Sequence, residues 1–480
     1  MNILMTASEA LPFCKTGGLA DVSYSLSKEF VKLKHNVSFV LPFYKGIEKK
    51  VHKKINHVCD LIVTMNWRKI NASIYHVVYD KIDYFLIKND YYFDRDNGLY
   101  GYYDDGERYA FFCLAIIELM KYLPIKFDVL HLNDWQVSML SCLMKTKYGS
   151  DNYFNKIKCV LTIHNPLFKG NINRDSLFDL YNLPTNLYDE GKVRLDGQVS
   201  TLKAGIVYSD KITTVSPTHR NELLTIDGSK GLYYDLLLRE DDFIGIVNGV
   251  DEKEFNPRKD KNIYVTYNET NVNTLKAKNK VEFCKENGLN PKVPMFAIVS
   301  RLTSQKGLEL IYGMAQEVIN HNGTFAILGS GEYEAECFFN RFKALNPKNS
   351  YVYIGYNDLL AHKLYASCDF FIMPSAFEPC GIGQMIAHRY GALPIVRRTG
   401  GLVDTVTCLN KENSNYLKAD GIGFDDFSNI EANESINKAF NLYYSDNKYM
   451  NTLRKNAMKK DHRWKKSALM YLDLYNSINK

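Results

Sequence analysis

The chain has 480 residues and a formal net charge of +6, with 46% hydrophobic and 24% charged side chains. This balance is typical of a globular protein and excludes a disordered chain, a collagen and a coiled coil. At roughly 100–200 residues per domain, the length indicates two to four domains. The 60 basic and 54 acidic residues are too evenly balanced to indicate a nucleic-acid-binding protein, but they are compatible with a local site for an anionic small molecule.

No apolar run approaches the roughly 18 residues that a membrane-spanning helix needs, and the N-terminus lacks the basic start of a signal peptide. The 10 cysteines are scattered, without C-x-x-C pairs or the spacing of metal ligands. We therefore expect a chain of the reducing cytosol, with no membrane partner, no metal site and most cysteines acting as small buried hydrophobic residues.

Short apolar runs alternate with helical patterns along the whole chain. In the first half, a helix is expected at residues 20–33, and strands are expected at residues 2–7, 37–41, 129–132, 160–163 and 211–215. In the second half, a helix is expected at residues 308–319, and strands are expected at residues 295–300, 325–328, 369–373 and 394–396. This alternation predicts an α/β fold with parallel sheets and helices on both faces of each sheet.

A turn signal at residues 246–251 follows a strand-like run and precedes a polar stretch rich in Asn and Lys. We place the domain boundary there, which gives an N-terminal domain at 1–247 and a C-terminal domain at 248–455. In the last segment, 456–480, apolar residues recur at helical spacing from Trp464 onward. We expect this segment to form a C-terminal helix that packs back on the N-terminal domain.

The first candidate ligand-binding loop is K-T-G-G-L-A-D at residues 15–21, directly after the first strand. Gly17 and Gly18 allow a ligand to approach the backbone closely, and the helix that follows directs its N–H groups at an anion or a sugar oxygen. Lys15 adds a positive charge. A plain strand-to-helix turn explains the same glycines equally well, because a glycine pair in such a loop is weak evidence.

Two further loops follow predicted strands of the second half. Arg301 and Lys306 lie on one loop at the carboxyl end of a parallel strand, where open α/β sheets bind ligands. Arg can hold a diphosphate through two hydrogen bonds, and Lys acts as a point charge. Glu378, in F-E-P-C-G, precedes a predicted helix and can accept hydrogen bonds from sugar hydroxyls; stabilisation of the helix dipole is its alternative role.

Several other features are less decisive. His131 and His164 close predicted strands, although a single histidine there is more often structural. A second glycine pair, T-G-G-L at residues 399–402, follows a strand. Asp94 and Asp96 form a D-x-D pattern that we interpret as a chance match rather than a metal site. The surrounding loop, residues 91–103, is rich in aromatic side chains that could stack on sugar rings or simply pack as a surface loop.

Together these segments resemble the family of bacterial glycogen synthases and plastid starch synthases, from the K-T-G-G-L-A-D-V loop almost to the C-terminus. The resemblance rests on ordered blocks that include T-I-H-N at Thr162, G-I-V-N-G-V-D at Gly245, V-S-R-L-T-S-Q-K-G-L at Val299 and P-I-V-R-R-T-G-G-L-V-D-T-V at Pro394. It implies a retaining glucosyltransferase with two Rossmann-like domains, the GT-B architecture, and an active-site cleft between them. The implied partners are ADP-glucose and the non-reducing end of an α-1,4-glucan, without a cofactor or a metal.

The resemblance also assigns roles to residues of this sequence. The implied catalytic residues are His164, Arg301, Lys306 and Glu378. The implied substrate-binding residues are Lys15, Gly18, Asp21, Asp134, Asn248, Tyr356, Cys380 and Gly381. Lys15 and Asp21 would lie beside the donor, and Tyr356 would stack near the adenine. Asp134 and Trp135 would lie on the acceptor side, together with the aromatic loop at residues 91–103.

The implied chemistry is coherent. Cleavage of the donor develops negative charge on the departing diphosphate, which Arg301 and Lys306 would stabilise. Retention without a carboxylate nucleophile requires front-side attack, so Glu378 would position the sugar rather than attack it. Two positions depart from the family pattern, Ala376 in place of a common Arg and Gly383 in place of Thr, Ser or Asn. These departures bear on donor affinity and on the choice of nucleotide base.

Two alternatives therefore accompany this prediction. One is the same transfer from UDP-glucose, because the base pocket is poorly defined by one sequence. The other is a non-catalytic glucan-binding protein with the same fold. The presence of all the implied catalytic residues argues against this second alternative. The sequence predicts neither the oligomeric state nor the processivity.

Overall fold

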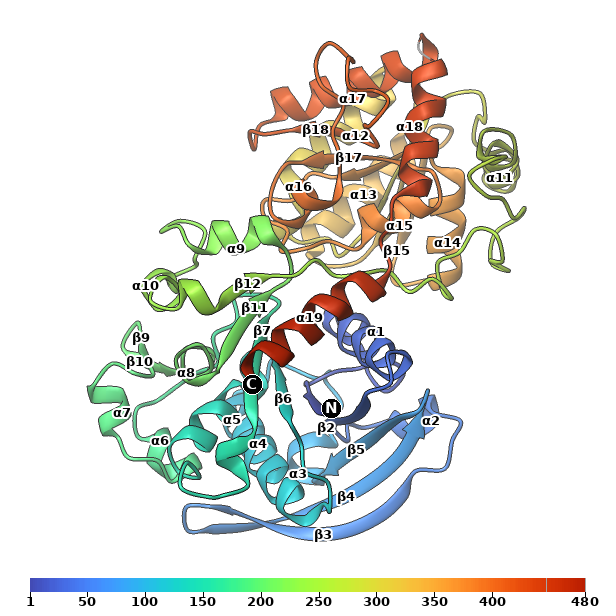
Figure 1. Ribbon diagram of the computed structural model, residues 1–480. Helices are drawn as coiled ribbons and strands as arrows, with labels where there is room; N and C mark the ends of the chain where they lie inside the picture. The colour runs from blue at the N-terminus through green and yellow to red at the C-terminus, as the bar shows by residue number, and fades with distance from the viewer. Residues whose placement is uncertain (446, 480) are drawn as a thin grey trace. The chain divides into compact units, whose positions relative to one another are not determined.

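The computed structural model describes residues 1–445 and 447–479. The chain divides into two compact units, whose elements are labelled in Figure 1. The first unit comprises Met1–Asn248 and the segment that begins at Trp464, and the second comprises Gly249–Arg463. The chain thus returns to the first unit at Trp464, whereas the sequence analysis began the C-terminal segment at residue 456. Asn248, expected in the second domain, belongs to the first unit.

The first unit is built on a nine-stranded sheet in the order β12-β11-β7-β6-β1-β2-β5-β4-β3. Its strands are β1 (Asn2–Thr6), β2 (Asn36–Pro42), β3 (Asn56–Met65), β4 (Arg68–Tyr79), β5 (Ile82–Lys88), β6 (Val129–Asn133), β7 (Lys158–Ile163), β11 (Lys211–Thr214) and β12 (Phe243–Gly245). Neighbours from β12 to β5 run parallel, whereas β4 and β3 extend the sheet as an antiparallel hairpin. The five predicted strands are confirmed, and β12 is the strand-like run noted before residue 246, whereas β3, β4 and β5 were missed.

Helices and a small second sheet complete the first unit (Figure 1). The small sheet has the order β8-β10-β9, with β8 (Asn171–Ile172), β9 (Arg194–Leu195) and β10 (Gln198–Ser200). The helices are α1 (Gly18–Lys32), α2 (Ile47–Lys50), α3 (Asp90–Phe93), α4 (Asp105–Tyr122), α5 (Trp135–Lys145), α6 (Ser176–Tyr181), α7 (Asn186–Asp189), α8 (Thr201–Tyr208), α9 (Pro217–Leu223), α10 (Tyr233–Leu237) and α19 (Trp464–Ile478), with 3-10 turns η1 (Phe154–Lys156) and η2 (Glu240–Asp242).

The second unit contains a six-stranded, fully parallel sheet in the order β15-β14-β13-β16-β17-β18. Its strands are β13 (Met295–Val299), β14 (Thr324–Gly329), β15 (Ser350–Ile354), β16 (Phe370–Met373), β17 (Leu393–Arg397) and β18 (Ile422–Phe424). Its helices are α11 (Val272–Asn287), α12 (Leu308–Asn320), α13 (Tyr333–Leu345), α14 (Asp358–Ser367), α15 (Gly383–Arg389), α16 (Gly401–Thr405), α17 (Asn429–Tyr444) and α18 (Asn447–Lys459), with the 3-10 turn η3 (Ser304–Lys306). The predicted α/β class is confirmed in both units.

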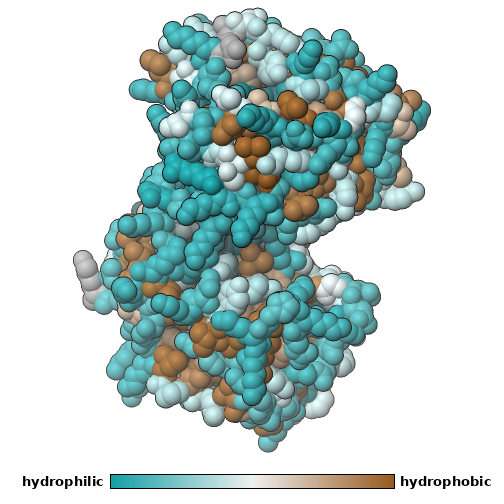
Figure 2. All heavy atoms as spheres, turned by 90° about the vertical axis from the view of Figure 1, so that its right-hand side faces the viewer, coloured by the Kyte–Doolittle hydropathy of each residue, from teal (hydrophilic) through white to brown (hydrophobic). Residues whose placement is uncertain are grey.

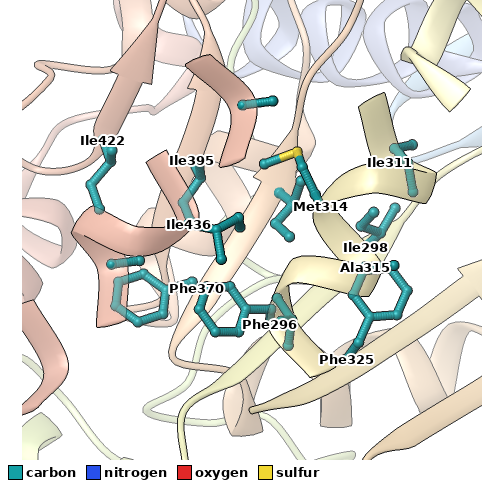
Figure 3. Close-up of a cluster of buried hydrophobic side chains, with 14 of the residues drawn as sticks. Phe296, Ile298, Ile311, Met314, Ala315, Phe325, Phe370, Ile395, Ile422 and Ile436 are labelled. Atoms are coloured by element: carbon teal, nitrogen blue, oxygen red, sulfur yellow. The ribbon is translucent and has the colours of Figure 1, made fainter. Parts of the chain in front are cut away.

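The core of the second unit lies between its sheet and the helices that cover it (Figure 3). Phe296 of β13 and Phe370 of β16 stack at 5.0 Å between ring centroids, and both are fully buried. Ile311 and Met314 of α12 meet the same cluster because they lie three residues apart on one helix face. Burial of each such side chain stabilises the fold by roughly 1.5–3 kcal/mol, so the strand ends that carry the site loops are rigidly held.

The terminal helix α19 belongs to the first unit and packs on its sheet and on α1. Tyr475 places its hydroxyl 2.6 Å from Nδ1 of His131, and its ring lies 5.6 Å from that of Phe30 in α1. On its other side, Nε2 of His131 lies 2.6 Å from the hydroxyl of Thr162. His131 is fully buried, and burial lowers its pKa to about 3. This histidine is therefore a structural residue that joins α19 to the sheet.

The chain crosses between the units twice, after Asn248 and after Arg463. A hydrogen bond within the second unit joins the segments next to these two crossings. The N–H of Val250 donates to the carbonyl of His462 at 2.8 Å. The imidazole of His462 is buried, with Nε2 2.9 Å from Nδ1 of His388, and the far side of His388 lies 3.3 Å from Asp420. Burial, with smaller contributions from His388 and Lys460, lowers the pKa of His462 to about 2.

This buried imidazole predicts acid sensitivity. His462 stays neutral in the folded chain, whereas an unfolded histidine takes up a proton below about pH 6.5. Stability is therefore lost as the pH falls through that value, and His462 should reduce the free energy of unfolding by about 2 kcal/mol between pH 7.5 and pH 5. Urea unfolding at both pH values measures the loss. The variant His462→Phe keeps a flat ring that cannot titrate, so an equal loss in this variant would contradict the assignment.

The surface is mixed in character. Figure 2 shows one face on which hydrophilic side chains predominate and hydrophobic ones lie in small scattered groups. Seven of the ten cysteines are buried, which agrees with their expected role as small hydrophobic residues. Among the described residues, no helix combines the length and the apolar character that crossing a bilayer demands.

Candidate functional site

The loop between β1 and α1 carries the first group of predicted site residues. α1 begins at Gly18, and no side chain caps its first N–H groups. Lys15 donates to Asp21 in the first turn, with Nζ 2.9 Å from Oδ1. Lys15, Gly18 and Asp21 thus lie together at the start of a fifteen-residue helix, where backbone N–H groups favour an anion or a sugar oxygen.

Glu9, which the sequence analysis overlooked, holds this loop in place. Its side chain is only 3% exposed, and its carboxylate accepts hydrogen bonds from the N–H of Thr16 at 2.5 Å and from the Thr16 hydroxyl at 3.1 Å. Burial raises the pKa of Glu9, while the hydrogen bonds from Thr16 and Gly17 oppose that shift. No sequence motif distinguishes Glu9, because its partner is seven residues away on an irregular turn.

A second group lies where the neighbouring strands β6 and β7 end. The N–H of His164 donates to Oδ1 of Asp134 at 2.7 Å, and Nε2 of His164 lies 2.9 Å from Oδ1 of Asn133. The amide nitrogen of Asn133 in turn donates to the carbonyl of Thr6 at 3.0 Å, which fixes Oδ1 as the acceptor. His164 therefore carries its proton on Nε2, and Nδ1 is left to accept a hydrogen bond.

The electrostatics of this group keep it close to neutral. Burial lowers the pKa of His164 to about 3, so the imidazole is uncharged at neutral pH. Burial also raises the pKa of Asp134 to about 7, although hydrogen bonds from the N–H groups of His164 and Asn165 oppose the shift. Asp134 adopts φ 61°, an uncommon backbone angle for a residue with a side chain, which marks a constrained position. A neutral imidazole beside a constrained carboxyl suits sugar hydroxyls better than phosphate.

Asn248 lies at the last position of the first unit before the chain crosses. Its side chain is 6% exposed, and no described residue bonds to its buried Oδ1 atom. Buried polar atoms usually have a hydrogen-bond partner, so this oxygen is available to a ligand, which is the role that the sequence analysis expects for Asn248.

In the second unit, the loops after the paired strands β13 and β16 bring the predicted residues together. Lys306 Nζ lies 2.5 Å from Oε2 of Glu378, with side-chain exposures of 18% and 7%. The Ser375 hydroxyl donates to the same oxygen at 3.0 Å. Arg301 is exposed and makes no ion pair with any residue that the structure describes, so its guanidinium can bind a ligand.

The second glycine pair supports the Glu378 loop through its backbone. The N–H of Gly401 donates to the carbonyl of Glu378 at 3.0 Å, and a Cβ added at Gly401 would lie 2.4 Å from Cα of Cys380. Only glycine allows this approach. Gly381 has φ 73°, another position that favours glycine, and the Cys380 side chain is buried. Cys380 and Gly381 are thus fixed next to Glu378.

Tyr356 lies in the loop after β15, on the same edge of the sheet. Its ring is 71% exposed, and its hydroxyl donates to Asp358. An exposed flat ring at the carboxyl edge of a parallel sheet is suited to stacking on a nucleobase.

The two aspartates of the D-x-D pattern form ion pairs with a lysine. Lys45 Nζ lies 2.8 Å from Asp96 and 3.8 Å from Asp94. Among the residues that the structure describes, no group of three metal-ligating side chains occurs. The two aspartates thus act as partners of a surface lysine.

The aromatic loop contributes to a pocket of about 420 Å³ in the first unit. The pocket is lined by Tyr102, Tyr103, Asp105, Gly106, Trp135, Leu167, Phe168, Lys169, Gly170 and Asn171. Tyr103 and Phe168 are 96% and 58% exposed, so their rings are available to stack on a ligand. The sequence indicated the aromatic loop and Trp135 but missed residues 167–171, although only Pro166 separates them from the T-I-H-N block.

Comparison with known proteins identifies the family. Residues 2–237 match the family model described as the starch synthase catalytic domain, and residues 279–460 match the model described as glycosyl transferases group 1. Glycogen synthases of Clostridium kluyveri and Bacillus cytotoxicus are 39% and 42% identical to the chain, with full coverage of both partners.

Solved structures agree with this result. The catalytic domain of starch synthase IV from Arabidopsis thaliana, solved with ADP and acarbose, has a TM-score of 0.92 and 28% identity, and 99% of each chain is covered. Sucrose-phosphate synthase from Thermosynechococcus elongatus, at 14% identity and a TM-score of 0.59, shares the GT-B fold. The chain therefore belongs to the glycogen and starch synthase family of glycosyltransferases.

Proposed function

We propose that this enzyme transfers glucose from ADP-glucose to the non-reducing end of an α-1,4-glucan and retains the anomeric configuration. The observation that carries the proposal is the cluster of Lys306, Glu378 and Ser375 on adjoining strand-end loops, with the exposed Arg301 on the same edge. The relative from Arabidopsis thaliana, which was solved with ADP and acarbose, supports the same choice of ligands.

The second unit would bind and stabilise the leaving group. As the bond between glucose and diphosphate breaks, negative charge grows on the phosphate oxygen. Lys306 is already held near that edge by Glu378, and Arg301 can add a bidentate contact. Fixed cations of this kind stabilise the transition state more than the ground state, because the charge they meet increases during the reaction. Tyr356 would stack on the adenine.

Glu378 would position the glucose of the donor and would not act as a nucleophile. Lys306 and Ser375 both engage its Oε2 atom, so the carboxylate is neutralised and fixed. An acceptor hydroxyl would then attack from the face that the diphosphate leaves, and its proton would pass to the departing phosphate oxygen. In the first unit, the neutral His164 and the buried Asn248 would receive glucose hydroxyls, and Lys15, Gly18 and Asp21 would lie near the donor.

Donor choice is tested directly. Purified enzyme should transfer labelled glucose from ADP-glucose to glycogen or a maltooligosaccharide, with a kcat/KM at least tenfold above that for UDP-glucose. Equal or greater use of UDP-glucose would overturn the donor assignment. Glucan binding without turnover of either donor would overturn the enzymatic proposal itself.

The pocket of the first unit is proposed as the acceptor site. Stacked aromatic pairs contribute about 0.5–1.5 kcal/mol, and we take the same range for a ring on a sugar face. Phe168→Ala should therefore raise KM for maltooligosaccharides about three- to tenfold at nearly unchanged kcat. Phe178→Ala is the matched control, because Phe178 is 53% exposed but does not line the pocket. Steady-state kinetics with a varied acceptor measure both variants, and equal effects would count against the pocket.

A further inference from the structure

The two oxygens of Glu378 have different surroundings. Oε2 accepts hydrogen bonds from the Lys306 ammonium at 2.5 Å and from the Ser375 hydroxyl at 3.0 Å. No residue that the structure describes donates to Oε1 of Glu378. A carboxylate offers acceptor sites on both oxygens, so Oε1 is the atom that Glu378 can present to a substrate hydroxyl. Its orientation depends on what holds Oε2.

Lys306 alone would fix the orientation of this carboxylate poorly. An ammonium on a four-carbon chain is a flexible point charge with three equivalent donors. Under the proposed function, Lys306 also meets the departing diphosphate, so its contact with Glu378 is shared at the moment when the sugar must be held most firmly. A second, immobile donor would keep the carboxylate oriented during that step.

Ser375 meets this requirement. It is 1% exposed, and its backbone is fixed at several points. Arg397 donates to the carbonyls of Ser375 and Ala376 at 3.3 and 2.8 Å. The N–H of Ala376 donates to the carbonyl of Gln305, next to Lys306, at 3.0 Å. The serine hydroxyl is thus carried on a backbone segment tied to the loop of Lys306.

We propose that Ser375 is a positioning residue, which holds the Glu378 carboxylate through Oε2 so that Oε1 faces the glucose of the donor. The inference rests on the proposed function and adds a residue to its machinery. A hydrogen bond to a charged group is stronger than a neutral one, so its loss should be visible in the rate.

A double-mutant cycle tests this role. Ser375→Ala should lower kcat for glucose transfer about tenfold, with a smaller change in KM for ADP-glucose. In the Glu378→Ala background, the same substitution should change kcat less than twofold, because the carboxylate that it acts through is gone. Ser375→Thr, which keeps the hydroxyl, should restore at least part of the lost rate.

Ser367→Ala is the matched control. Ser367 is also 1% exposed in the second unit, and its hydroxyl donates to a main-chain carbonyl of Asn279 at 3.2 Å. The Ser367→Ala variant should keep kcat within twofold of that of the unchanged enzyme. Equal losses from Ser375→Ala in both backgrounds would show a general structural role and overturn the inference alone. An unchanged enzyme that transfers no glucose would overturn the proposed function and this inference with it.

Discussion

Replacing Lys306 by alanine is expected to lower kcat for glucose transfer about a thousandfold while the chain remains folded. A single fixed hydrogen-bond donor at a developing oxyanion is worth about 10²–10³ in rate, and a cation aimed at a leaving diphosphate belongs at the upper end of that range. The substitution also leaves the Glu378 carboxylate without its charge partner, at a side chain that is only 7% exposed. For that reason we also expect the free energy of unfolding to fall by about 1–3 kcal/mol.

Transfer of labelled glucose to glycogen and thermal unfolding, measured on the same preparations, separate the two effects. Lys348→Ala is the control, because Lys348 is exposed in the same unit and has no predicted role. It should match the unchanged enzyme in both measurements. If Lys306→Ala kept kcat within tenfold of the unchanged enzyme, the assignment of Lys306 to the leaving group would fail.

The site loops of the second unit were predictable because their signals are local in the sequence. A short apolar run followed by glycine and charged residues indicates a parallel strand that ends at the ligand-binding edge. Lys306 and Glu378 are 72 residues apart, but both follow such runs, and β13 and β16 pair in the sheet. Their contact therefore follows from the topology once both strands are recognised.

The β3–β4 hairpin was missed although its burial alternates with a period of two over most of its length, from Val58 to Met65 in β3 and from Arg68 to Tyr75 in β4. Other parts depend on information that no short segment contains. Ser375 and Glu9 act through side-chain orientation, which spacing does not reveal. The pocket joins the aromatic loop to residues 167–171, whose proximity arises only from the folded chain.

Gly307 is the position where backbone geometry should control the chemistry most directly. It has φ 76°, and a Cβ added there would lie 2.1 Å from the carbonyl oxygen of Pro374 and 3.0 Å from its carbon. Pro374 directly precedes Ser375, and Gly307 directly follows Lys306. Gly307→Ala must therefore push apart the two loops that bring Lys306 to Glu378. A displacement of about 1 Å in a catalytic site can cost about a hundredfold in rate, so we expect kcat to fall by at least that factor.

Gly288→Ala separates this clash from simple backbone strain. Gly288 has φ 67° at the end of α11, and a Cβ added there would meet no atom within 4 Å. Both substitutions force alanine into a left-handed conformation, at a cost of about 1–2 kcal/mol in stability. Thermal unfolding should show this loss in both variants, whereas only Gly307→Ala should lose transfer activity. Since the two glycines share their backbone conformation, an active Gly307→Ala variant would mean that catalysis tolerates separation of the loops, and the role given to their contact would be wrong.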